Sequence, residues 1–243
     1  LFGTRFDGPR LYVVTYLRVD PLWVVDLSDP ARPRVAGELE VPGWSTYLHP
    51  MGDRLVTMGI DDVNGFRASV SLFDVPDVSA PRLLSRVSLG DHYSWSEATR
   101  NEKAFKVLPE QGLILVPFEG AGGSQVKLID LHADSLAARS TIAHTFQPRR
   151  ATYHQDRVLS LSGSELLSVD VADRDHPQVK AEIELAWSVD QGFLQGRAAE
   201  TMRERARLGA GRIAVFADVL VKHAAPIVET LEGEVSAYIP TNV

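Results

Sequence analysis

The stretch LWVVDLSDP at residues 22–30 decides how this chain folds. It is a run of β-branched and aromatic residues that ends in Asp and a polar turn, and a second strand from Arg34 to Val41 follows it. Such a run prefers a pleated, packed strand, and an Asp side chain can bond a backbone N–H two residues further on and so start a turn. We therefore predict a β-hairpin over residues 22–41.

The same pattern recurs three more times along the chain. The later copies are VSLFDVPD at 70–77, VKLIDLHAD at 126–134 and LLSVDVAD at 166–173. The anchoring aspartates of the four copies are Asp26, Asp74, Asp130 and Asp170. Consecutive aspartates lie 48, 56 and 40 residues apart (74 − 26, 130 − 74 and 170 − 130). This spacing brackets the period of about 40 to 50 residues that is typical of propeller blades.

Two further short strands precede each hairpin, so each repeat is expected to hold four strands. Polar turns such as DGP at 7–9 and GD at 52–53 separate these strands. Four strands joined by short polar turns are typical of a propeller blade, and a blade buries both of its faces only by stacking on its neighbours. We predict an all-β fold, a β-propeller with about four four-stranded blades. The alternative, a β-sandwich with irregular loops, does not predict a repeated four-strand unit.

The repeats also set the expected domain boundaries. The propeller is predicted at 1–186, with blades at about 1–43, 44–91, 92–145 and 146–186. From Trp187 onward the pattern breaks, and good helix formers with charged neighbours lie between Phe193 and Leu208. Residues 187–243 are therefore predicted to be an appended α/β segment, a C-terminal extension of helix plus strand.

Composition excludes several classes of function. The 243 residues include 25 Lys and Arg and 32 Asp and Glu, a net charge of −7. Nucleic-acid binding needs a concentrated basic surface, so we expect no nucleic-acid partner. The absence of cysteine excludes disulfides, thiolate nucleophiles and zinc–thiolate sites. The sequence contains no run of about 18 apolar residues, so it predicts no membrane-spanning helix. Since the chain opens at Leu1 rather than Met, we expect it to be part of a longer protein.

Several longer strings resemble one protein family. They are VDPLWVVDLSDP at 19–30, GWSTYLHP at 43–50, SLFDV at 71–75, SEA at 96–98 and KAF at 103–105. Over about residues 1–185 the chain resembles the exported bacterial and archaeal proteins that carry a β-propeller domain distantly related to WD repeats. The resemblance implies the fold and an exported or cell-surface location, but it implies no reaction. The chain departs from the family pattern at Thr99 to Glu102 and in its shorter N-terminal part.

Oxygen-bearing side chains gather in one predicted turn. Asp61, Asp62 and Asn64 supply the oxygen ligands that calcium prefers. The segment lacks the alternating acidic spacing and the distal Glu of an EF-hand, and an Asp/Asn/Gly cluster between strands is ordinarily a hairpin turn. We therefore expect no cofactor, with a calcium site at these three residues as the one alternative.

The histidines offer a second route to a metal. None of the seven forms a His-x-His or His-Glu-x-x-His motif. His144 and His154 can approach each other across neighbouring strands, as can His92 at a blade junction, so a site assembled from several blades is one alternative. The other is that these histidines lie in turns and at the edge of the core.

The candidate binding residues are two tryptophans and a histidine. Trp44 and Trp95 are predicted at connections between blades, with His92 at the same junction as Trp95. Such side chains can form an exposed surface for a sugar or a protein, or they can pack half-buried. Ser94 and Ser96 beside His92 suggest a nucleophile, but the chain has no Gly-x-Ser-x-Gly elbow there, and a structural role is the better interpretation.

The leading functional hypothesis is a non-enzymatic binding module of an exported or cell-surface protein. Its partner would be a protein, peptide or glycan that binds where the loops between strands gather at one end face. A metal-dependent, calcium-type hydrolase or lactonase-like propeller enzyme is the first alternative, and it rests on analogy of fold alone. A structural or assembly domain is the second alternative.

Overall fold

The structure is a computed structural model that describes residues 3–15, 20–63 and 65–185. The chain divides into two units, Leu1–Ala186 and Trp187–Val243. All described residues belong to the first unit, so the predicted α/β segment at 187–243 lies outside the described residues. Within the described ranges the helical segments are three 3-10 turns, and no helix there is long and apolar enough to cross a membrane.

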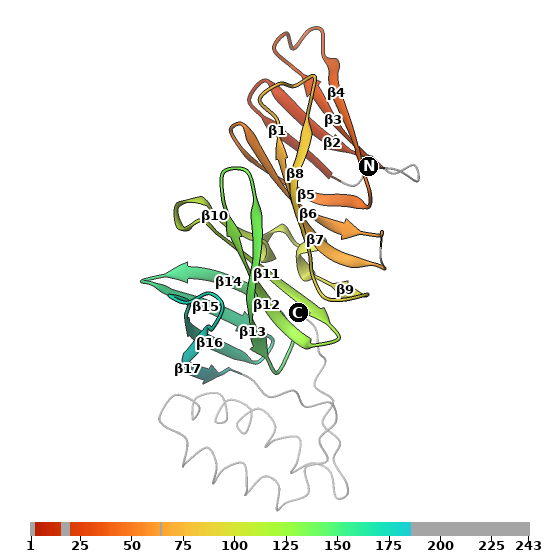
Figure 1. Ribbon diagram of the computed structural model, residues 1–243. Coiled ribbons are helices and arrows are strands. Elements are labelled where there is room, and N and C mark those ends of the chain that lie inside the picture. The colour runs from red at the N-terminus through yellow and green to blue at the C-terminus, as the bar shows by residue number, and fades with distance from the viewer. Residues whose placement is uncertain (1–2, 16–19, 64, 186–243) are drawn as a thin grey trace, which may run out of the picture. The chain divides into compact units, whose positions relative to one another are not determined.

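Four antiparallel sheets follow one another along the chain, and we call them the first to fourth blades (Figure 1). The first blade consists of β1 (Gly3–Asp7), β2 (Arg10–Val14), β3 (Asp20–Asp26) and β4 (Arg34–Val41). The second consists of β5 (Trp44–Met51), β6 (Arg54–Asp61), β7 (Arg67–Asp74) and β8 (Arg82–Ser88). In both blades the strands pair in sequence order, as a meander. The predicted four-strand repeat is confirmed.

The third and fourth blades repeat this order with one interruption. The third consists of β9 (Ser94–Trp95), β10 (Lys106–Leu108), β11 (Leu113–Gly120), β12 (Gly123–Leu131) and β13 (Leu136–His144). The fourth consists of β14 (Pro148–His154), β15 (Arg157–Ser162), β16 (Glu165–Asp170) and β17 (Gln178–Glu184). Both β9 and β10 pair with β11. The 3-10 turns η1 (Glu97–Thr99) and η2 (Glu102–Ala104) lie between them, so the first strand of this blade is in two pieces.

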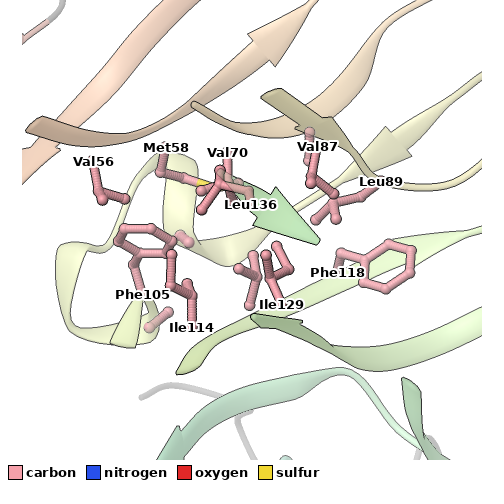
Figure 2. Packing of buried hydrophobic residues seen from close by; sticks show 14 of the residues in the cluster. Val56, Met58, Val70, Val87, Leu89, Phe105, Ile114, Phe118, Ile129 and Leu136 are labelled. Atoms are coloured by element: carbon pink, nitrogen blue, oxygen red, sulfur yellow. The ribbon is translucent and has the colours of Figure 1, made fainter. Parts of the chain in front are cut away.

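The apolar cores lie between the blades. One cluster joins the first and second blades, another joins the second and third, and a last one joins the third and fourth. Neighbouring residues of one strand point to opposite cores: Leu55 packs toward the first blade and Val56 toward the third. Figure 2 shows Val56 and Met58 of the second blade facing Phe105 and Ile114 of the third. Each blade therefore buries an apolar face on each neighbour.

The last strand of every blade carries a β-bulge near the same place. The register shifts at Val24/Val25, Leu72/Phe73, Lys127/Ile129 and Ser168/Val169 of the preceding strands. Next to the bulge, the last strand of three blades places a small residue at the same position, opposite the third strand. The pairs are Val24 with Gly37, Leu72 with Ser85, and Ser168 with Ala181.

At these positions the next blade docks with the turn before its own last strand. A Cβ on Gly37 would lie 2.1 Å from the carbonyl oxygen of Val78 in the second blade. Ser85 accepts a hydrogen bond through its hydroxyl from the backbone N–H of Leu136 at 3.0 Å. In the third blade the N–H of Ser140 donates to the carbonyl of Arg174 at 3.1 Å. The second, third and fourth blades thus each contact the last strand of the blade before them at the turn that leads into their own last strand.

The contact at Gly37 is testable by substitution. Gly37→Ala is expected to lower the free energy of unfolding by about 1–3 kcal/mol, because the added methyl group overpacks the junction between two blades. Urea unfolding followed by circular dichroism measures this change. Gly163→Ala is the matched control, since a Cβ there meets nothing within 4 Å. Equal stability of the two variants would contradict this account of the junction.

Candidate binding surface

The meander places the connections of each blade at two opposite edges. The turns that join its first two strands and its last two strands lie at one edge, which we call the anchor edge. The turn between the second and third strands lies at the other edge, together with the connection to the next blade. We call this the loop edge. The repeated aspartates lie at the anchor edge, because each ends a third strand or lies next to its last residue.

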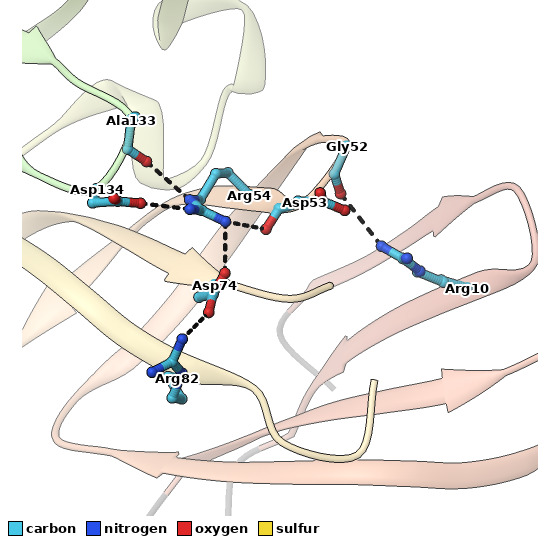
Figure 3. A network of polar contacts seen from close by, with 8 residues as sticks. All are labelled: Arg10, Gly52, Asp53, Arg54, Asp74, Arg82, Ala133 and Asp134. Atoms are coloured by element: carbon cyan, nitrogen blue, oxygen red, sulfur yellow. Dashed lines mark hydrogen bonds and ion pairs between the residues drawn. The ribbon is translucent and has the colours of Figure 1, made fainter. Parts of the chain in front are cut away.

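Arginines hold the repeated aspartate of the second blade. Asp74 accepts from Arg54 at 2.6 Å and also from Arg82. Arg54 reaches on to the third blade, where it bonds the carboxylate of Asp134 at 2.5 Å and the carbonyl of Ala133 at 2.9 Å (Figure 3). The buried carboxylate of Asp74 is thus paired with two guanidinium groups, one of which connects two blades.

Asp130 of the third blade is held in the same way. Arg139 of its own blade donates to it at 2.6 Å, and Arg174 donates to it from the fourth blade. Arg174 also bonds the carbonyls of Gln111 and Gly112, at 2.7 and 2.9 Å. Burial by itself would raise the pKa of Asp130, but the hydrogen bonds from Arg174 and then Arg139 outweigh it and lower the pKa below the ordinary value.

The repeated aspartates of the first and fourth blades form the turn that the sequence predicts. Asp26 accepts from the backbone N–H of Ser28 at 2.9 Å, and Asp170 accepts from that of Ala172 at 3.1 Å. The predicted Asp-initiated turn is therefore present in these two blades. All four repeated aspartates pair with arginine, Asp26 with Arg34 at 2.6 Å and Asp170 with Arg157 at 2.5 Å, but in the second and third blades the arginine bonds are present without this turn. The arginines at 34, 82 and 139 follow their aspartates by 8, 8 and 9 residues (34 − 26, 82 − 74 and 139 − 130), a signal that the repeat analysis left unused.

At the loop edge of the second blade, Asp61 is bound by the protein itself. Its carboxylate accepts from the Arg67 guanidinium and the Ser88 hydroxyl, each at 2.6 Å, and from the N–H of Val63 at 3.1 Å. Burial would raise the pKa of Asp61, but the bonds from Ser88, Val63 and Arg67 together lower it. These donors leave little room for a cation at this carboxylate.

The structure describes one of the other two predicted calcium ligands. Asp62 is exposed, and Asn64 lies outside the described residues. The described part of the chain contains no group of three or more His, Cys, Asp or Glu side chains arranged to hold a metal. The calcium site stays a prediction, and its clearest alternative is the turn that Asp61 makes with Val63.

Two loops of the second blade are joined into one platform at the loop edge. Phe66 and Tyr93 form an isolated parallel bridge, and the N–H of Ser94 donates to the Phe66 carbonyl at 3.0 Å. Gly65 has φ +102°, and a Cβ there would lie 1.9 Å from the carbonyl oxygen of His92. Only glycine allows this approach of the two backbones. The loop after β6 and the connection after β8 are therefore held directly against each other.

Aromatic side chains cover this platform. Phe66 and Tyr93 are 55% and 67% exposed, and Val63 is exposed beside them. The half-buried ring of Trp44 meets Phe66 edge to face, with ring centroids 6.0 Å apart. We call Trp44, Val63, Phe66 and Tyr93 the aromatic patch. The exposed side chains of Asp62, Asp91 and His92 lie in the same two loops.

Of the three predicted binding residues, the structure places two at the aromatic patch or in its loops and one in a strand of the third blade. Trp44 belongs to the aromatic patch, and His92 lies in the loop that carries Tyr93. Trp95 is half-buried in β9, where it pairs with Glu119 of the third blade. Phe66 and Tyr93 were not among the predicted residues, because only the pairing of two distant loops brings them together.

The serines beside His92 have structural partners. Ser94 accepts from the N–H of Ala68 at 2.9 Å and donates to the carbonyl of Leu89 at 2.6 Å. Ser96 caps η1 by accepting from the N–H of Ala98 and donates to the carbonyl of Pro117 at 2.5 Å. Both side chains are buried. Their hydroxyls therefore stabilise the first strand and turn of the third blade, the structural role preferred from the sequence.

A buried Ser–His–Glu trio joins the end of the third blade to the fourth blade. His144 contacts Glu165 through Nδ1 at 2.8 Å and Ser160 through Nε2 at 2.6 Å. Nucleophilic sites use this order of groups, but the exposed fractions of Ser160 and of the His144 side chain are both 0%. Glu165 also accepts from the N–H of Thr145. The trio therefore ties the connection after β13 to β15 and β16. His154 ends β14 and is exposed at the anchor edge, so His144 and His154 are not brought together.

Comparison with known proteins agrees with the repeated four-stranded sheets. A family model described as a beta propeller domain matches residues 1–173. The chain belongs to this β-propeller family. The predicted fold and family resemblance are confirmed. The crystal structure of a protein from Lactobacillus plantarum resembles the propeller, with a TM-score of 0.50 over 78% of this chain and 56% of that one. At 13% identity this likeness concerns the fold alone.

Two archaeal relatives of the propeller are described as uncharacterized proteins. One, from Methanocaldococcus jannaschii, is 41% identical over 105 residues, which are 43% of this chain and 16% of that protein. The other, from Archaeoglobus fulgidus, is 36% identical over 117 residues, which are 48% of this chain and 18% of that protein. The matched part of the propeller therefore spans less than a fifth of either relative.

The arginine anchor of the third blade gives a pH-dependent prediction. Because the pKa of Asp130 is lowered in the folded state, its charged form stabilises the fold above the ordinary aspartate pKa of 3.8, and this contribution is lost as the pH falls through the lowered pKa. Arg174→Gln should lower the free energy of unfolding at pH 7 by about 1–3 kcal/mol, and its difference from wild type should shrink in acid. Urea unfolding across this pH range is the measurement, with exposed Arg150→Gln as control. A constant difference would count against the anchor.

Calcium binding is tested by thermal unfolding with calcium or a chelator. Since Asp61 is already bonded by Arg67, Ser88 and Val63, we expect the melting temperature to be the same in millimolar calcium as in excess EDTA. Stabilisation by calcium that disappears in the Asp62→Asn variant would instead establish the predicted site.

Proposed function

We propose that this propeller is a non-enzymatic binding module whose aromatic patch binds a cationic segment of a protein or peptide. The observation that carries the proposal is the pair of exposed rings, Phe66 and Tyr93, on a platform held together by backbone contacts. Exposed aromatic side chains next to one another are uncommon on a surface that has no partner, and they are typical of binding sites.

The charges around the patch favour a cation. Asp62 and Asp91 are exposed in the two loops that carry the rings. The positive charge of Arg67 is already paired with Asp61 at 2.6 Å. A Lys or Arg side chain over the face of an aromatic ring is stabilised by roughly 0.5–2 kcal/mol, and a nearby carboxylate adds to this attraction. A basic peptide satisfies both features, whereas an acidic ligand would meet like charge.

The platform also limits the free energy lost on binding. The hydroxyl of Ser94 bonds the N–H of Ala68 and the carbonyl of Leu89, so the loop with Tyr93 is fixed to the blade on both sides. Phe66 is fixed through its backbone carbonyl and its edge-to-face contact with Trp44, and the residue is still 55% exposed to a ligand. A surface that is already ordered loses less conformational entropy when a partner binds.

No observation favours the hydrolase alternative over this one. Within the described ranges, the Ser160 trio is buried and the Asp61 carboxylate is engaged by protein donors. A glycan can also stack on aromatic rings, and this alternative is part of the test below. The exported or cell-surface location rests on the family resemblance and stays a prediction.

Binding to the patch is measured with a fluorescein-labelled lysine-rich peptide by fluorescence anisotropy. We expect saturable binding at low salt that weakens as salt increases, because exposed charges are screened. Phe66→Ala combined with Tyr93→Ala should weaken binding by roughly tenfold or more, from the loss of cation–π contacts. Circular dichroism checks that the double variant is folded.

The matched control is Phe146→Ala, which removes an exposed ring at the connection after β13. This variant should bind like wild type. A glutamate-rich peptide of equal length should not bind. If a neutral oligosaccharide displaces the lysine peptide and binds more tightly, the ligand class is a glycan and the cationic assignment is wrong. Equal binding by wild type and the double variant would reject the patch itself.

A further inference from the structure

A tyrosine and a histidine lie where the first strands of three blades approach one another. Gly3 of β1 lies against β5, because a Cβ on Gly3 would be 3.1 Å from the carbonyl oxygen of Thr46. In β5 the ring of Tyr47 packs edge to face on Phe105, which directly precedes β10, with ring centroids 5.7 Å apart. The hydroxyl of Tyr47 lies 3.4 Å from Nδ1 of His49, and both residues are half-buried. The first strands of the first, second and third blades therefore meet around these two side chains.

Two positively charged side chains from different blades flank this pair. Arg5 pairs in the sheet with Tyr12, which faces the second blade, so Arg5 is on the same side of the first blade. Lys106 directly follows the residue whose ring packs on Tyr47. Both cations are exposed. The charge of Arg5 acts on Tyr47 and His49, and the charge of Lys106 acts on His49. We call Arg5, Tyr47, His49 and Lys106 the His49 cluster.

Neither cation of the cluster forms an ion pair within residues 3–15, 20–63 and 65–185. By contrast, Arg67 and Arg157 bond carboxylates of their own blades, and Arg174 bonds a carboxylate of the neighbouring blade. Carboxylates are in excess in this chain, since its net charge is −7, yet none in the described ranges pairs with Arg5 or Lys106. Two like charges that act on the same histidine repel each other, and an anion between them attracts both. The charges of the cluster therefore favour an anionic ligand.

Tyr47 and His49 add hydrogen-bond donors to the cluster. Burial raises the pKa of Tyr47, with Arg5 opposing this shift and Glu102 adding to it, so the hydroxyl keeps its proton at neutral pH. Burial, and then the charges of Arg5 and Lys106, lower the pKa of His49 below its ordinary value. The neutral ring still carries one N–H group, and protonation gives it a second. Guanidinium, ammonium, imidazole and phenol groups all donate to the oxygens of phosphate and sulfate.

We propose that the His49 cluster binds a tetrahedral dianion, a phosphate or sulfate group, between Arg5 and Lys106. This inference is independent of the ligand proposed for the aromatic patch, whose exposed rings lie in the loops after β6 and β8. A tetrahedral oxyanion has enough oxygens to accept two bonds from a guanidinium group and a further bond from an ammonium group, and its charge is about −2. A monocarboxylate has two oxygens and a single charge, so it leaves part of the cluster unmatched.

Isothermal titration calorimetry of the full chain with sodium sulfate, sodium phosphate and sodium acetate tests the ligand class. At equal ionic strength we expect one-to-one binding of the dianions, the tighter of which identifies the group, and much weaker binding of acetate. Arg5→Gln should weaken dianion binding by roughly fivefold or more, because a bidentate charged contact is lost. Arg32→Gln is the matched control, since Arg32 is an exposed arginine in a turn at the anchor edge, and it should bind like wild type. No binding of either dianion, equally tight binding of acetate, or equal effects of the two variants would overturn the proposal.

Removal of the negative charge of Glu102 should have the opposite effect. Glu102 is exposed in η2, and its charge acts on Tyr47. This charge repels a bound anion, so Glu102→Gln should tighten sulfate binding by roughly twofold or more at low salt. A misfolded variant cannot produce such a gain. Glu38→Gln, at an exposed position on the last strand of the first blade, is the control and should leave the affinity unchanged. Unchanged affinity in Glu102→Gln would place the anion elsewhere and reject the cluster.

Sulfate binding should also become tighter in acid through His49. The charged groups that act on His49 are Arg5 of β1 and Lys106 of β10; both stay charged between about pH 5 and 8, and Tyr47 stays neutral. Because a bound anion favours the protonated imidazole, affinity rises as the pH falls through the lowered pKa of His49. His49→Gln should still bind sulfate at about pH 8 and should lose this rise, as measured by the same calorimetry. An equal rise in His49→Gln would exclude His49 from the site and overturn the assignment.

Discussion

Burial of both faces of every sheet is the constraint on which this fold depends. Strand residues alternate between two sides, so Leu55 and Val56 in one strand serve two different cores. A single four-stranded sheet leaves half of its apolar residues in water, and stacking on both sides removes that exposure. The stability of a blade is therefore tied to its neighbours rather than to its own strands alone. Substitutions at a junction are expected to affect two blades at once.

The two edges of the blades solve different problems. At the anchor edge, carboxylates and guanidinium groups pair with one another and with backbone carbonyls across blade boundaries, as Arg54 and Arg174 do. These charges are satisfied within the protein. At the loop edge of the second blade the carboxylate of Asp61 is likewise bonded by protein donors, but the rings of Phe66 and Tyr93 are left at the surface. The ion pairs of the repeated aspartates therefore lie at one edge, and the surface proposed to bind a ligand lies at the other.

Periodicity explains what the sequence alone could predict. The four copies of the Asp-ended strand are local patterns, so the hairpins, the four-strand repeat and the blade order follow from them. The partners of the aspartates do not follow, because Arg174 reaches Asp130 across 44 residues and a blade boundary. The aromatic patch escaped prediction for the same reason: Phe66 and Tyr93 meet only when two loops pair. Trp44 was found because a large ring at a blade connection is informative by itself. The partners of His144 also escaped prediction, because its ring bonds Ser160 and Glu165 of the next blade.

The bulge that recurs in the last strand of each blade has a consequence for how such a molecule avoids aggregation. An outermost strand presents unpaired N–H and C=O groups that can recruit a strand from another chain. In β17 the bulge falls at Lys180, which distorts the hydrogen-bonding edge and adds a charge to it. Pro33, Pro81 and Pro177 precede three of these strands and withhold a donor just before the edge begins. The bulge, the charge and the prolines thereby disfavour pairing of the outer strand with a strand of another chain. Packing on the apolar faces of a blade is not affected, but it requires a surface of complementary shape.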